Sequence, residues 1–178
     1  MRVARRPQNS QKAKFRHNTM IAQMKLLEIL VTALAYATVA DGKIKVEQKS
    51  HLLSLMGKHV NLHKDLTEDQ LSTLSRKAFD FARTAPLENF IKTVTAELSS
   101  GQQAVLLMNL YDTVAADGTM ADGEMDVIEK FERRLNIDLS TMKIARKVIF
   151  NKNDTTVFTN PLHSGNGPGF VFRLEDTD

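Results

Sequence analysis

The chain has 178 residues, of which 42% are hydrophobic and 25% charged, and its formal net charge at pH 7 is +3. This length and composition suit one folded domain with a buried core and argue against a largely disordered chain. The sequence contains no cysteine, which excludes disulfides, thiolate zinc sites and thiol nucleophiles.

The positive charge is concentrated in a basic N-terminal arm, residues 1–17. The arm holds six of the 24 arginines and lysines and no acidic residue. The rest of the chain therefore contains 18 basic and 21 acidic residues. Such an arm is either a solvated tail or a contact for an anionic surface, with Arg2, Arg5 and Arg6 as its candidate binding residues. Phe15 is its one aromatic side chain, so the stacking typical of nucleic-acid binding is not indicated.

Apolar residues recur at helical spacing through residues 18–150, which predicts an all-α domain. The run over residues 29–40 is shorter than the roughly 20 residues needed to cross a bilayer. We therefore expect no transmembrane segment, no secretory signal and either a cytoplasmic location or a place in a virus particle. Seven helices of one bundle are expected, over residues 18–40, 46–60, 67–83, 86–98, 100–116, 122–135 and 140–150. The spacing of Thr67 and Gln70 predicts a capping box at the third helix, and Ser140 is the expected cap of the seventh.

An Asp-Gly pair ends an apolar helix pattern twice, about 75 residues apart. The first is Asp41-Gly42 and the second is Asp117-Gly118. The repetition predicts two copies of one helical unit related by a pseudo-two-fold axis. The glycines suit a left-handed C′ position, and the aspartates would then close an Asx-turn.

A second interpretation of the same turns is a site for a hard cation. Aspartate is mildly unfavourable at a helix C-terminus, because the last carbonyl groups carry the negative end of the helix dipole. Two such turns at one end of a bundle could pool carboxylate oxygens, which are ligands for Ca²⁺ rather than Zn²⁺. The candidate metal ligands are Asp41, Glu47, Asp117, Asp122 and Glu124.

The two segments resemble the paired signatures of the tellurite-resistance TerB family. They read Ala40-Asp41-Gly42-Lys43-Ile44-Lys45-Val46-Glu47 and Ala116-Asp117-Gly118-Thr119-Met120-Ala121-Asp122-Gly123-Glu124. The resemblance covers roughly residues 20–150, and the fold it implies is similar to the N-terminal domain of the membrane-anchored DnaJ-like co-chaperone DjlA. It implies an all-helical domain with internal two-fold symmetry, an acidic divalent-cation site, no known catalysis and a scaffolding role in stress response. One departure is that Lys43, Lys45 and Lys49 lie close to the first turn, where they could neutralise its carboxylates.

The composition changes after residue 150. Residues 151–178 carry three of the eight glycines together with Phe158, Phe170 and Phe172. Residues 170–174 have the composition of a strand but no evident partner strand in the chain. We interpret this segment as a tail or a docking arm, with the three phenylalanines as partner-binding residues.

Two functions follow from these patterns, and neither is enzymatic, because no catalytic motif is present. The first is a TerB-like interaction or scaffold protein that binds a divalent cation, most plausibly Ca²⁺, through its acidic turns. The second is a structural subunit of a large assembly, such as a virus particle, that uses its terminal arms to latch onto neighbouring chains. Protein partners are expected in both cases.

Overall fold

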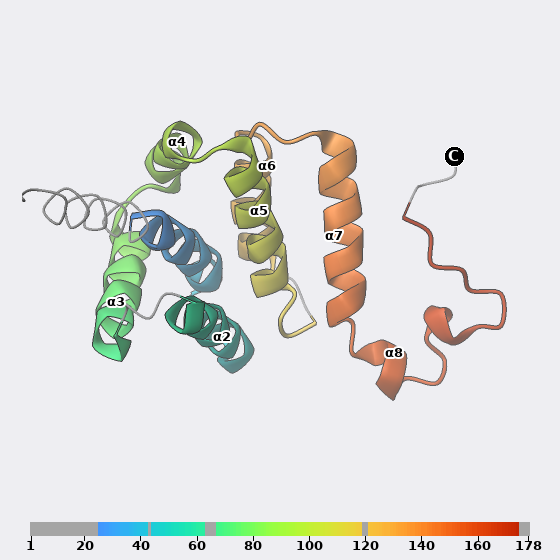
Figure 1. Ribbon diagram of the computed structural model, residues 1–178. Coiled ribbons are helices and arrows are strands. Elements are labelled where there is room, and N and C mark those ends of the chain that lie inside the picture. The colour runs from blue at the N-terminus through green and yellow to red at the C-terminus, as the bar shows by residue number, and fades with distance from the viewer. Residues whose placement is uncertain (1–24, 43, 63–66, 119–120, 175–178) are drawn as a thin grey trace, which may run out of the picture.

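The predicted all-α fold is confirmed by a computed structural model, which describes residues 25–42, 44–62, 67–118 and 121–174. Figure 1 shows the arrangement. The first helix is described over residues 25–39, and no strand occurs within the described ranges, including residues 170–174. The later helices are α2 (Val46–Leu62), α3 (Glu68–Thr84), α4 (Leu87–Glu97), α5 (Ser100–Val114), α6 (Asp122–Glu132), α7 (Leu139–Asn153), the short α8 (Thr156–Thr159) and the 3-10 turn η1 (Ser164–Asn166).

Local capping explains where several helices begin. Thr67 and Gln70 form the expected capping box at α3, in which the Gln70 side chain accepts a hydrogen bond from the Thr67 amide at 2.9 Å. Ser99 caps α5 in the same way. The expected cap of α7, Ser140, is wrong: Asp138 is the N-cap, and its carboxylate accepts the Thr141 amide at 3.0 Å. An ionised acceptor at a helix N-terminus also interacts favourably with the helix dipole.

The first helix lies at the centre of the bundle. Val31, Leu34 and Ala37 are fully buried, which is the pattern of a helix that is apolar around its whole circumference. In Figure 1 it lies between α3 and α5, while α7 covers the other side of α5. Leu107, Leu110 and Val114 make α5 the second central helix.

Aromatic rings join the first helix to α3, α4 and α6. The Phe90 ring of α4 lies 5.3 Å from the Tyr36 ring and 6.4 Å from the Phe131 ring, measured between centroids. The Tyr36 hydroxyl also donates to the Ala85 carbonyl oxygen at 2.8 Å, 49 residues away. One buried cluster of this kind fixes the first helix against α3, α4 and α6.

Close backbone contact brings the two predicted halves together. Gly123, in the first turn of α6, lies against the end of the first helix. A Cβ atom at this position would stand 2.6 Å from the Ala40 carbonyl oxygen and 3.0 Å from the Ala40 carbonyl carbon. Since backbone atoms cannot move aside as a flexible side chain can, glycine is required for this approach.

Gly123→Ala should therefore lower the free energy of unfolding by about 2 kcal/mol, through overpacking against the Ala40 carbonyl. Urea denaturation followed by circular dichroism measures the change. Gly101→Ala is the matched control, because a Cβ atom there meets nothing within 4 Å, and it should alter stability by no more than about 0.5 kcal/mol. Equal effects of the two substitutions would contradict the close approach.

Candidate functional site: an acidic corner beside an open groove

The two Asp-Gly turns adopt the same conformation. Gly42 and Gly118 both have φ = 76°. Their amides donate to the carbonyl oxygens of Val39 and Ala115 respectively, each at 3.0 Å. Because this left-handed conformation strains any L-residue, glycine at these positions fixes the direction in which the chain leaves each helix. The helical repeat is therefore 76 residues long at the level of individual hydrogen bonds.

The carboxylates of both turns converge on one ammonium group. The Lys45 Nζ atom lies 2.7 Å from Asp117 Oδ2, 3.5 Å from Glu124 Oε1 and 4.0 Å from Asp41 Oδ2. Glu124 is fully buried, and the two aspartates are largely buried. We call Asp41, Lys45, Asp117 and Glu124 the acidic corner.

The electrostatics of the acidic corner favour the charged form of its lysine. The hydrogen bond to Asp117 raises the pKa of Lys45, the partial burial opposes this, and the charges of Glu124, Asp117 and Asp41 raise it further. Lys45 therefore remains an ammonium ion throughout the neutral pH range. This cation is part of the chain and cannot diffuse away.

A buried glutamine, Gln48, completes the acidic corner, although the search of the sequence for acidic ligands did not identify it. Gln48 and Glu124 are the third residues of α2 and α6, separated by the 76-residue repeat. Each side chain accepts a hydrogen bond from the amide that precedes its helix: Lys45 to Gln48 at 3.4 Å, and Ala121 to Glu124 at 2.9 Å. The Gln48 amide also donates to Glu124 Oε1 at 2.5 Å. The repeat-related side chains thus meet each other where the two halves join.

A groove opens between α2 and α3 beside the acidic corner. Its volume is about 1020 Å³. Leu52, Met56 and Leu71 contribute buried apolar surface, while Val46 and Leu53 are 74% and 57% exposed. The charged residues of the groove are Lys45, Lys49, Arg76, Arg83, Glu68 and Asp80. We call this feature the α2–α3 groove.

Comparison with models of protein families places the helical domain in a known family. The model of the tellurite resistance protein TerB family matches residues 28–147, two thirds of the chain. The chain belongs to the TerB family. Comparisons with curated proteins and with solved structures gave no match.

The TerB match covers both acidic turns, and the structure separates the predicted ligands into two groups. Asp41, Asp117 and Glu124 come together at Lys45. Glu47 and Asp122 are exposed on the first turns of α2 and α6 and do not join them. The 76-residue offset makes Gln48, and not Glu47, the position equivalent to Glu124.

The acidic corner of this TerB domain fits an ammonium group better than a divalent ion. Both Glu124 oxygens already accept hydrogen bonds, from Gln48 and from the Ala121 amide. The Lys45 ammonium lies between the carboxylates, where a metal ion would have to bind. Among the described ranges, no group of three or more His, Asp or Glu residues has an arrangement suited to a metal ion. The Ca²⁺ expectation from the sequence stays a prediction.

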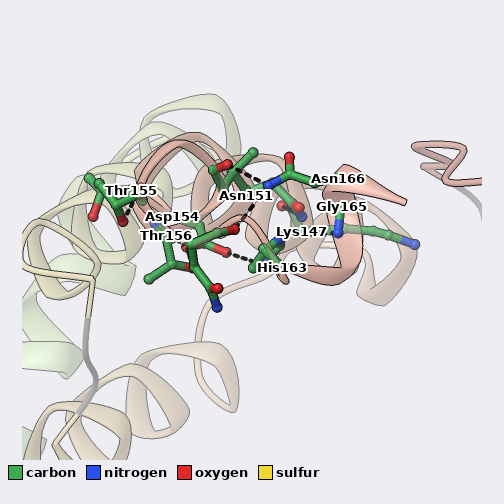
Figure 2. A network of polar contacts seen from close by, with 11 residues as sticks. Lys147, Asn151, Asp154, Thr155, Thr156, His163, Gly165 and Asn166 are labelled. Atoms are coloured by element: carbon green, nitrogen blue, oxygen red, sulfur yellow. Dashed lines mark hydrogen bonds and ion pairs between the residues drawn. The ribbon is translucent and has the colours of Figure 1, made fainter. Parts of the chain in front are cut away.

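The C-terminal segment, residues 154–174, lies outside the TerB match and is held by its own polar contacts (Figure 2). His163 Nε2 lies 3.1 Å from an Asp154 carboxylate oxygen, and the Gly165 amide donates to His163 Nδ1 at 2.9 Å. Asn166 donates to the carbonyl oxygens of Val157 and Asn160. The segment nevertheless leaves its apolar side chains in solvent, and Phe158 and Leu162 are 93% and 92% exposed.

The predicted partner-binding residues are thus only partly described. Phe158, Phe170 and Phe172 are all exposed on the C-terminal segment. Arg2, Arg5 and Arg6 lie outside the described residues. None of the helices in the described ranges combines the length and the hydropathy that a membrane crossing requires.

A second polar cluster lies at the C-terminal end of α7, beyond the residue at which the helix was expected to end. The Asp112 carboxylate of α5 accepts hydrogen bonds from Lys152 at 2.5 Å and Asn153 at 2.7 Å, and lies 3.8 Å from His51 of α2. Lys152 and Asn153 lie in the last turn of α7, which continues to Asn153 instead of ending at residue 150. Burial raises the pKa of Asp112, but the hydrogen bonds from Lys152 and Asn153 outweigh it and hold that pKa below its ordinary value.

Asp112→Asn should reduce the free energy of unfolding at pH 7 by about 2 kcal/mol, because it removes the charge that these donors bind. A depressed carboxyl pKa stabilises the fold above the unfolded-state pKa, and this contribution disappears as pH falls through the folded-state pKa. The difference between the two proteins should therefore shrink as pH falls below the ordinary carboxyl pKa and vanish once Asp112 is protonated in the folded state. Urea denaturation across a pH series measures it.

The control for this series is Asp126→Asn. Asp126 forms an exposed ion pair with Lys130 at 2.8 Å, and its loss should alter stability by less than about 1 kcal/mol. If the Asp112→Asn defect persisted at low pH, the carboxylate charge would not be its cause.

Proposed function

We propose that this TerB-family chain is a non-catalytic interaction module that joins copies of itself head to tail. In each contact, the C-terminal segment of one copy occupies the α2–α3 groove of the next. The observation that carries the proposal is that one chain leaves both an apolar groove and an apolar segment uncovered. Apolar surface of this kind on a folded protein marks a binding site.

The groove has the chemistry of a site for an apolar peptide. Its apolar walls come from α2 and α3, and Val46 and Leu53 stand at the solvent boundary. Burying these two side chains on a partner would contribute on the order of 2 kcal/mol each. Lys49, Arg76 and Arg83 outnumber Glu68 and Asp80, so the groove favours a partner with acidic residues.

The C-terminal segment has the matching chemistry. Phe170, Val171, Phe172 and Leu174 form an exposed apolar run. Residues 173–178 add one base and three acids, Arg173, Glu175, Asp176 and Asp178. An aromatic run with a net negative charge suits an apolar groove in which basic residues are in excess.

The positions of the groove and the segment favour contact between different copies. In Figure 1 the C-terminal segment extends beyond α7, while α2 and α3 lie on the other side of α5. The segment of one copy is thus directed away from its own groove. Contacts between two different surfaces are heterologous, and they propagate into chains unless the geometry closes a ring.

The acidic corner supports a structural rather than a catalytic role. Its carboxylates are engaged by Lys45, Gln48 and the Ala121 amide, which leaves them poorly placed to act on a substrate. Head-to-tail contact would serve a cytoplasmic scaffold as well as a subunit of a large assembly.

The proposal is tested by two variants that damage opposite sides of the same contact. Leu53→Glu places a charge in the groove, and Phe170→Ser/Phe172→Ser removes the aromatic run of the segment. Each variant alone should be a monomer by light scattering coupled to size-exclusion chromatography, whereas the unsubstituted protein should form dimers and longer species as its concentration rises. An equimolar mixture of the two variants should restore a dimer, because each supplies the surface that the other lacks.

Val105→Glu is the matched control, since Val105 of α5 is 55% exposed and lies outside the groove. It should assemble like the unsubstituted protein. A synthetic peptide of residues 168–178 should bind the protein and compete with assembly. An unsubstituted protein that remains monomeric up to about 1 mM and does not bind this peptide would contradict the proposal.

A further inference from the structure

We infer that Lys45 is the resident cation of the acidic corner: its tethered ammonium takes the place of a dissociable divalent ion and makes the joint between the two halves independent of metal. The inference does not depend on head-to-tail assembly, because it concerns contacts within one copy. It rests on the juxtaposition of Lys45, Gln48 and the three carboxylates.

The position of the ammonium is the first argument. Lys45 belongs to the segment after the first turn, yet its shortest contact is the 2.7 Å hydrogen bond to Asp117 of the second turn. The same Nζ atom lies within 4.0 Å of Asp41 and Glu124. One cation thus bridges carboxylates that are 76 residues apart, as a bound metal ion would.

The burial of Glu124 is the second argument. A fully buried carboxylate requires a compensating charge and hydrogen bonds, because desolvation of an isolated charge is very unfavourable. Lys45 supplies the charge at 3.5 Å. The Ala121 amide and Gln48 supply hydrogen bonds to the two oxygens. All the requirements of this carboxylate are therefore met by the chain.

The identity of residue 48 is the third argument. The repeat places Gln48 and Glu124 in equivalent positions, and their side chains touch at 2.5 Å. A carboxylate at position 48 would repel that of Glu124 unless a cation lay between them. An amide instead donates a hydrogen bond to Glu124, so the pair is stable without a second positive charge.

The inference gives the acidic corner a defined role beside the groove. Ile44, Lys45 and Val46 line the α2–α3 groove as well as following the first turn. Fixing Lys45 therefore fixes one end of the groove wall. The shape of the groove should then be insensitive to Ca²⁺ and to chelators.

Thermal unfolding and calorimetry test the inference. The melting temperature of the unsubstituted protein should be the same in Ca²⁺ and in EDTA, and calorimetric titration with Ca²⁺ should give no heat of binding. Lys45→Met keeps the apolar stem and removes the charge, and it should lower the melting temperature by about 10 °C. Lys77→Ala changes an exposed lysine of α3 that lies outside the groove; it is the control and should leave the melting temperature within about 2 °C of the original.

A converted variant provides the complementary result. Lys45→Ala/Gln48→Glu removes the ammonium and adds a fourth carboxylate, so it should bind Ca²⁺ in calorimetry and gain at least about 5 °C in melting temperature when Ca²⁺ is added. A Ca²⁺-dependent rise in the unsubstituted protein would overturn the inference, as would a Lys45→Met protein that melts at the original temperature. Failure of the converted variant to bind Ca²⁺ would also count against it, because the carboxylates would then not enclose a cation position.

Discussion

The ion pair between Lys45 and Asp117 is the contact on which the arrangement of the two helical halves depends. It spans 2.7 Å in space and 72 positions in sequence, and it draws Asp41 and the buried Glu124 to the same ammonium. Without that charge, three carboxylates would lie close together in a poorly solvated place, and their mutual repulsion would favour separation of the turns. The close approach of Gly123 to the Ala40 carbonyl group is a second contact between the same two halves.

The groove and the acidic corner share an element, the first residues of α2. Gln48 points into the joint, and Val46 is exposed beside the groove. A helix that is anchored by polar contacts on one face can leave apolar side chains exposed on another without losing its position. This separation of the anchored face from the exposed face suits the proposed interaction module, because the face that would contact a partner does not hold the helix in place.

Several features of the fold follow from the sequence by local rules. Helical periodicity, the capping box of Thr67 and Gln70, and the glycines of the two turns act over a few residues and can be identified without a structure. The similarity of the two Asp-Gly segments also predicted the internal repeat. Local rules do not decide between two neighbouring residues that can both cap a helix. Asp138 caps α7 in preference to the expected Ser140.

The sequence by itself determined the helical class, the repeat and the acidic character of the turns. The tertiary structure alone decided which acidic side chains meet. Glu47 and Asp122 match the pattern as well as Asp41 and Asp117 do, but the direction of a side chain depends on its exact position in the first helical turn, and both are exposed. Gln48 is not acidic and is identified only by its contact with Glu124. Whether Lys45 reaches solvent or the opposite turn depends on how the two halves pack, because long-range electrostatic contacts are set by the fold and not by neighbouring residues.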